Sequence, residues 1–213
     1  PKIGKPAIAP LLEILDSQKE DLELRWFALR ILGEFNEPEV VISLVKLLEE
    51  TQEEELAIMS AQALAKIGQP AVSALIELLK DEKSRLLAVK SLAQIRRSEV
   101  IEPLLWVVDD SMAEVRLTAI EALSSFHHKS LIPVFIKALQ DTSSSVRKEA
   151  VIALKMRAYL EEEFDLVNRL QPLLFDINSE VCQQAVLAMG CMKDSSAITA
   201  LSDILKAKHA PLF

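Results

Sequence analysis

Apolar residues recur along the chain with the spacing of one buried helical face. Leu44, Leu47 and Leu48, for example, are separated by three and one positions and are preceded by Val40 and Val41. This spacing places the side chains on a single stripe of an α-helix. Segments of this first class end in an apolar pair and often an Asp. We expect such helices at residues 6–16, 38–50, 69–81, 98–110, 129–141, 160–176 and 195–207.

A second class of helix follows the first, and residues 115–123 and 146–154 are its clearest copies. Aligned on their last apolar residue, the copies end at Leu32, Leu64, Leu92, Leu123, Leu154 and Met189. One position of this template always holds a small residue, as expected where a helix approaches its neighbours closely. These residues are Ala28, Ser60, Ala88, Ala119, Ala150 and Ala185. The pattern predicts a repeating pair of helices with a period of about 31 residues.

A pair of helices this short cannot bury its apolar face alone, so successive pairs must stack. The sequence therefore predicts an all-α fold, an α-solenoid of helical hairpins, with no β-strand. A tetratricopeptide repeat would need a longer unit with a Trp, Gly and Tyr signature, and the chain has one Tyr. The Thr-Pro-Leu-His signature of ankyrin repeats is absent.

Two motifs carry a resemblance to a known family. Ile-Gly-x-Pro-Ala occurs at residues 3–7 and 67–71, and Asp-x4-Val-Arg begins at Asp110 and at Asp141. With these motifs the chain resembles, over essentially its whole length, the short HEAT-like repeats named after the phycobilisome lyases. The resemblance implies an α-α superhelix, a right-handed solenoid of HEAT-like hairpins. We expect one solenoid over residues 1–213, with about six helix pairs and a final helix, as part of a chain that is longer at its N-terminus.

The resemblance also implies a polar ladder between successive repeats, in which an Asp ends the first helix of a pair and an Arg begins the second. Its residues here are Asp110, Arg116, Asp141 and Arg147. We expect a structural role for these residues, and the alternative is a catalytic carboxylate or an anion site. The pattern is imperfect, because Ala57 and Cys182 stand at two of the Arg positions.

In this family the second helix of each pair lines the concave side, which implies a partner-binding groove. Its expected residues form two rows on these helices: Trp26, Ile58, Leu86 and Leu117, and Arg30, Gln62, Lys90 and Glu121. The first row is apolar, and large exposed apolar patches mark interaction sites. The alternative is that neighbouring helices cover this row. We expect Trp106, within an apolar run of the other helix class, to belong to the core.

Charge narrows the range of partners. The chain has 24 Lys and Arg against 32 Asp and Glu, a net charge of −8. This balance argues against the basic surface that nucleic-acid binding needs. The acidic clusters at residues 49–55 and 161–163 are interpreted as solvated edges, with a basic partner or a cation as the alternative. With two Cys, no long apolar run and no signal peptide, we expect a cytoplasmic protein without membrane insertion.

The sequence contains little catalytic chemistry. It has three His, no His-Glu dipeptide, no Gly-rich phosphate loop and no Gly-x-Ser-x-Gly motif. We therefore expect no catalytic residues, no metal and no cofactor.

Two functions follow from these observations. The first is a non-enzymatic scaffold or adaptor that binds another protein, or a peptide segment, in its groove. The alternative is an accessory or chaperone-like subunit of a phycobilin lyase, which is the one enzymatic role the resemblance suggests. A solenoid DNA glycosylase is disfavoured by the acidic balance.

Overall fold

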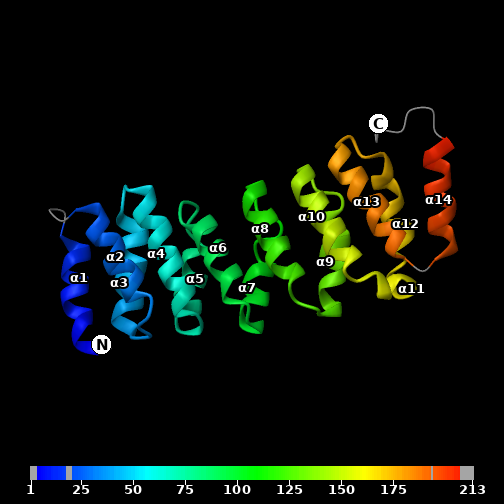
Figure 1. Cartoon of the computed structure of the whole chain (residues 1–213). Coiled ribbons are helices and arrows are strands. Elements are labelled where there is room, and N and C mark those ends of the chain that lie inside the picture. Colours follow the sequence, from blue (N-terminus) through cyan, green and yellow to red (C-terminus); the bar gives the residue numbers. More distant parts are fainter. Residues whose placement is uncertain (1–3, 18–20, 193, 207–213) are drawn as a thin grey trace. The chain divides into compact units, whose positions relative to one another are not determined.

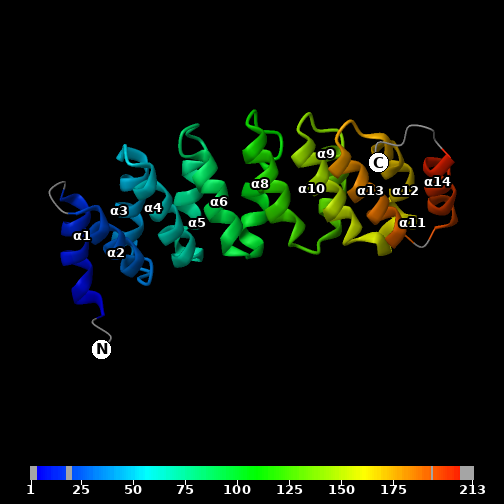
Figure 2. The same ribbon diagram turned by 45° about the horizontal axis from the view of Figure 1, so that its top comes forward.

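The computed structural model describes residues 4–17, 21–192 and 194–206, and side chains as far as residue 203. Within these ranges the chain is helical and has no β-strand, so the predicted all-α fold is confirmed. Two compact units divide the chain, residues 1–107 and residues 108–213. The single solenoid expected over residues 1–213 stays a prediction. Figures 1 and 2 show consecutive helices side by side within each unit.

The described residues of the first unit form seven α-helices and three short 3-10 helices. They are η1 (Lys5–Ala7), α1 (Ile8–Asp16), α2 (Leu22–Leu32), α3 (Pro38–Glu50), α4 (Glu54–Ile67), η2 (Gln69–Ala71), α5 (Val72–Leu78), α6 (Arg85–Ile95), η3 (Ser98–Val100) and α7 (Ile101–Leu105). Helices α2, α4 and α6 are the second helices of their pairs, and α4 packs against both α2 and α6.

In the second unit, the part of the chain that the structure describes forms seven α-helices and three short 3-10 helices. They are α8 (Ala113–Ser124), η4 (Lys129–Leu131), α9 (Ile132–Ala138), α10 (Ser144–Lys155), η5 (Ala158–Leu160), α11 (Glu161–Phe164), α12 (Leu166–Leu170), η6 (Gln171–Phe175), α13 (Ser179–Cys191) and α14 (Ser195–Lys206). Helix α10 packs against both α8 and α13.

The repeated template positions form the core of each unit. The six small residues of the template, from Ala28 to Ala185, are all buried. The six closing residues, from Leu32 to Met189, are buried as well. The register predicted for the second helices is therefore confirmed.

The first helices of the pairs are less regular than predicted. Several begin as a 3-10 turn, with Pro6 in η1 and Pro70 in η2. The segment predicted as one helix over residues 160–176 is divided into α11, α12 and η6. The interruption lies at Asp165, whose left-handed backbone has a φ of 53°. The buried carboxylate of Glu161 accepts the N–H of Leu166 at 2.9 Å and so satisfies a donor that the break leaves without a helical partner.

Trp106 is exposed over 60% of its surface, so its assignment to the core is wrong. It follows the last residue of α7, and the buried residues of this segment are Leu104 and Val107. Leu104 and Val107 lie three positions apart on one helical face. Trp106, one position before Val107, therefore points away from that face.

Candidate binding surface

A hollow lies between α4 and α6 in the first unit, with a volume of about 520 Å³. Four of the residues predicted for the groove line it: Ile58 and Gln62 from α4, and Leu86 and Lys90 from α6. The other lining residues are Leu48, Glu49, Thr51, Gln52, Glu54, Ala57, Ala61, Asp81, Lys83, Ser84, Leu87, Ser91 and Gln94. We call this feature the α4–α6 hollow.

The hollow has a mixed lining of apolar, polar and charged side chains. Ile58 remains 37% exposed and Leu86 is half-buried, so both present apolar surface to a ligand. Gln62 and Lys90 are exposed, one turn further along their helices. Ligand-binding clefts combine apolar side chains with polar groups that fix the orientation of the ligand, and this hollow offers both kinds.

The remaining predicted groove residues lie outside the α4–α6 hollow. Trp26 on α2 is half-buried, and its indole Nε1 is buried with no hydrogen-bond partner among the described residues. Arg30 on the same helix is exposed, and its guanidinium lies 5.4 Å from the ring centre of Phe27. In the second unit, Leu117 on α8 is half-buried and Glu121 is exposed. The α4–α6 hollow thus brings together the members of the two predicted rows that lie on α4 and α6.

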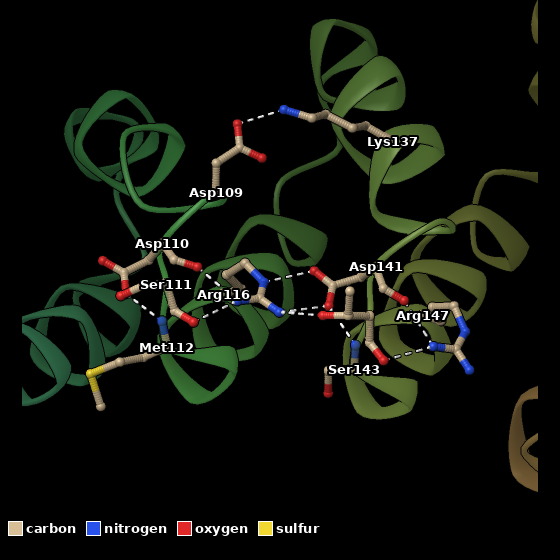
Figure 3. A network of polar contacts seen from close by, with 10 residues as sticks. Asp109, Asp110, Ser111, Met112, Arg116, Lys137, Asp141, Ser143 and Arg147 are labelled. Carbon is tan, nitrogen blue, oxygen red and sulfur yellow. Dashed lines mark hydrogen bonds and ion pairs between the residues drawn. The ribbon is translucent and has the colours of Figure 1, made fainter.

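The polar ladder residues make a regular set of contacts in the second unit (Figure 3). Arg116 donates from Nε and Nη2 to the two carboxylate oxygens of Asp141, each at 2.7 Å. Its Nη1 donates to the backbone carbonyl of Asp110 at 2.7 Å. The Arg116 guanidinium therefore joins the loop of its own repeat to the carboxylate of the next.

Arg147 repeats this arrangement one helix pair later. Its Nε and Nη2 each donate to Asp176 at 2.7 Å, and its Nη1 donates to the carbonyl of Asp141 at 2.8 Å. The side chains of both pairs are at most 12% exposed. Hydrogen bonds from Arg147 lower the pKa of Asp176, against the opposing effect of burial. Burial alone would raise the pKa of Asp141, but hydrogen bonds from Arg116 and Ser143 outweigh it and lower that pKa.

The ladder changes where the sequence departs from its pattern. At the Arg position of α13, Cys182 donates from Sγ to the carbonyl of Asp176 at 3.0 Å, and burial raises the pKa of its thiol. In the first unit, Arg25 donates from Nη2 to the carbonyl of Leu15 at 3.0 Å, while its buried Nε has no partner among the described residues. At the Arg position of α4, Ala57 lines the α4–α6 hollow.

Sequence reasoning missed a buried cation in the second unit. Arg157 is 1% exposed and donates to the carbonyls of Ala153 at 2.6 Å, Ser124 at 2.9 Å and Phe126 at 2.6 Å. Its guanidinium carbon lies 4.8 Å from the ring centre of Phe135. Burial lowers the pKa of this group. The guanidinium joins the ends of α8 and α10, a role that no repeated motif in the sequence indicates.

The two acidic clusters differ in the structure. Glu49 and Glu54 of the first cluster line the α4–α6 hollow. In the second cluster Glu161 is buried, so its interpretation as part of a solvated edge is wrong, whereas Glu163 is exposed and pairs with Lys129 at 2.6 Å. Among the described residues, no group of three or more His, Cys, Asp or Glu is arranged to hold a metal ion. None of the helices in those ranges has both the length and the apolar character needed to cross a bilayer.

The sequence and the structure are similar to known repeat proteins. The family model for HEAT repeats matches residues 8–87, 74–155 and 132–212. No curated protein has a matching sequence. Among solved structures, the Escherichia coli protein YibA has a TM-score of 0.66 at 22% identity, with 95% of this chain and 77% of that chain covered.

Two further structures have related folds. The complex of CpcE and CpcF of phycocyanin lyase from Nostoc has a TM-score of 0.59 at 21% identity, covering 71% of this chain and 99% of that chain. A designed armadillo repeat protein in complex with the peptide (KR)4 has a TM-score of 0.55 at 23% identity, covering 87% and 99%. At these identities the likeness shows a shared fold.

Proposed function

Because the chain belongs to the HEAT-repeat family, a fold typical of protein-binding scaffolds, we propose that it is a non-enzymatic scaffold that binds a peptide segment of another protein. The observation that carries this proposal is the α4–α6 hollow of about 520 Å³, lined by Ile58, Gln62, Leu86 and Lys90. Apolar side chains left accessible beside polar groups suit a ligand with both kinds of side chain. The armadillo neighbour with a bound peptide is consistent with this use of the fold.

The two rows of residues have different places in the proposal. Ile58, Gln62, Leu86 and Lys90 form the contact surface in the first unit, and Trp26 and Arg30 extend it along α2. Leu117 and Glu121 are the corresponding residues of the second unit.

The polar ladder has a separate, structural role in this proposal. Asp110, Arg116, Asp141 and Arg147 are half-buried, and each guanidinium is already occupied by a carboxylate and by backbone carbonyls. Such groups have little capacity left for a ligand. We assign them to the stability of the repeats.

The test is selection from a random peptide display library followed by measurement of the selected peptides against two variants. Ile58→Asp places a charge in the α4–α6 hollow and should weaken binding at least tenfold. Ile42→Asp is the matched control, because Ile42 is 67% exposed on α3 of the same unit and lines no described hollow. Equal binding by both variants, or no selected peptide at all, would contradict the proposal. The accessory lyase subunit suggested by the resemblance stays a prediction, and a chromophore-transfer assay with a phycobilin is its test.

A further inference from the structure

The ladder Arg has the same surroundings wherever it is present in the second unit. Its guanidinium donates hydrogen bonds to the carboxylate of the Asp that ends the next repeat's first helix. It also donates to backbone carbonyls of its own loop. In Arg116 these acceptors are Asp141 and the carbonyls of Asp110 and Ser111. Each such site is therefore a preformed receptor for one guanidinium group.

The second repeat contains this receptor without its guanidinium. Arg116 follows Asp110 by six positions and Arg147 follows Asp141 by six, and the same count from Thr51 leads to Ala57. Thr51 keeps the turn, since its Oγ1 accepts the N–H of Glu53 at 3.2 Å, as Asp110 accepts the N–H of Met112. Ala57, however, has no side chain that can reach the next repeat.

Asp81 stands where the ladder carboxylate of this repeat is expected, opposite the position at which Ala57 replaces the Arg. It ends the first helix segment of the third repeat, as Asp141 and Asp176 end theirs. Its Oδ2 accepts Ser84 N at 3.0 Å and Ser84 Oγ at 2.6 Å. Among the described residues no guanidinium is hydrogen-bonded to its side chain, which is exposed, whereas Asp141 and Asp176 are largely covered by the Arg side chains that they bind. Hydrogen bonds from Ser84 lower its pKa, which keeps the group charged at neutral pH.

The space that an Arg side chain at position 57 would occupy belongs to the α4–α6 hollow. Thr51, Ala57 and Asp81 all line the α4–α6 hollow. The carboxylate, the turn and the alanine thus surround one cavity that opens beside the apolar surface of Ile58 and Leu86.

The charges around the hollow favour a cation. Three carboxylates line it, those of Glu49, Glu54 and Asp81, against the ammonium groups of Lys83 and Lys90. Lys83 lies close enough to lower the pKa of Asp81. Glu49 and Glu54 belong to the acidic run at residues 49–55. An arginine of the peptide would gain a bidentate, charge-assisted contact of the kind its own ladder uses.

We propose that the α4–α6 hollow is a receptor for an arginine side chain of the bound peptide, whose guanidinium takes the place that Arg116 and Arg147 occupy in their own repeats. This inference rests on the proposed function, because it specifies the chemistry of the peptide that the hollow binds. The flanking residues of such a peptide would be apolar, to match Ile58 and Leu86.

The experiment compares two acetylated, amidated peptides that differ in one group. One is Ser-Leu-Arg-Leu-Ser, and the other has citrulline, a neutral isostere, in place of Arg. Binding is followed by NMR titration of the methyl groups of Ile58 and Leu86. We expect the Arg peptide to bind about tenfold more tightly than the citrulline peptide, since a hydrogen bond to a charged group is worth this factor.

Three variants locate the effect. Ala57→Arg fills the hollow with the chain's own guanidinium, and Asp81→Asn removes the carboxylate, so both should reduce the preference for Arg over citrulline to about one. Ala113→Arg adds the same side chain at an exposed position of α8 and should keep the preference. Ala57→Arg should also raise the melting temperature, by about 2–4 °C for a gain of about one hydrogen-bonded ion pair in a chain of this size.

The outcomes separate this inference from the proposed function. If both peptides shift the Ile58 and Leu86 signals with equal affinity, the groove binds peptides but the arginine receptor is wrong. If Ala57→Arg lowers the melting temperature, or leaves the preference for Arg intact, the receptor is also wrong. If neither peptide binds the unmodified protein, this inference fails, while peptides selected by display still decide the proposed function.

Discussion

Arg116 and Asp141 are 25 residues apart in sequence and form a two-point contact, with both N–H···O distances at 2.7 Å. Their side chains are 12% and 11% exposed. A second ion pair in the same unit, Lys137 with Asp109 at 2.6 Å, is far more open, with exposures of 68% and 63%. The two pairs lie close together in Figure 3, which makes them a natural comparison.

We expect Arg116→Ala to destabilise the protein by about 3 kcal/mol, because it leaves the carboxylate of Asp141 partly buried without its guanidinium. Lys137→Ala is the control, and it should cost much less because solvent screens an exposed pair. Urea unfolding of the two variants measures the difference. Equal losses would show that the ladder contributes no more to stability than an ordinary surface pair.

The same contact predicts a response to acid. The pKa of Asp141 is lower in the folded protein than the value of about 3.9 expected in the unfolded chain. The carboxylate therefore stabilises the fold above about pH 4, and this contribution is lost as the pH falls through the folded-state pKa. The stability advantage of the unmodified protein over Asp141→Asn should be complete at pH 6 and should shrink below pH 4. A constant difference between the two over this range would contradict the assignment.

Glu149 on α10 predicts the opposite dependence of stability on pH. Burial raises its pKa, and the nearby carboxylate of Glu121 raises it further, against smaller opposing effects of Ser124 and Lys148. The folded protein thus binds this proton more tightly than the unfolded chain. The contribution of Glu149 to stability is greatest below about pH 4 and declines as the pH rises through the raised pKa. Glu149→Gln should melt at a higher temperature than the unmodified protein at pH 7 and at nearly the same temperature at pH 4, whereas the exposed control Glu162→Gln should change little at either pH.

The contacts of Arg157 predict that the stability of the protein depends strongly on the shape of the cation at this position. Its guanidinium donates to three carbonyls from two helix ends and lies over Phe135. A lysine ammonium is compact and cannot reproduce this planar set of donors. Arg157→Lys should therefore cost about 2 kcal/mol, since buried carbonyls are left unsatisfied. Thermal unfolding measures this cost, and a loss as small as that of the exposed control Arg97→Lys would be the contrary result.

The helices were predictable because each repeat uses the same positions for the same purpose. In the second helix of each pair, a small residue such as Ala119 and a closing residue such as Leu123 are separated by one helical turn. Six copies of this spacing therefore support one register. The orientation of Trp106 was not predictable in this way, because a continuous apolar run has no polar positions to mark which face is buried. The break at Asp165 and the role of Arg157 occur once each, and a repeat pattern carries no information on single events.

The candidate site was predictable in part. The spacing placed Ile58, Gln62, Leu86 and Lys90 on facing helices, and the structure places all four around one hollow. The sequence also showed that Ala57 replaces an arginine. What it could not show is that the space of the missing side chain stays open and includes Asp81, because that depends on how the loop at residues 81–84 packs.

Helix α4 offers a direct comparison of core and surface within one element. Leu64 is fully buried at the closing position of the template, whereas Ile58, less than two turns earlier, is 37% exposed at the α4–α6 hollow. Leu64→Ala should lose about 2–5 kcal/mol of unfolding free energy, because it removes buried apolar surface and leaves a cavity. Ile58→Ala should cost much less stability and should instead weaken the binding of peptides selected by display, since its contacts are with the ligand. Denaturant unfolding and peptide titration of both variants distinguish the two roles, and a stability loss at Ile58 as large as that at Leu64 would place Ile58 in the core and remove it from the binding surface.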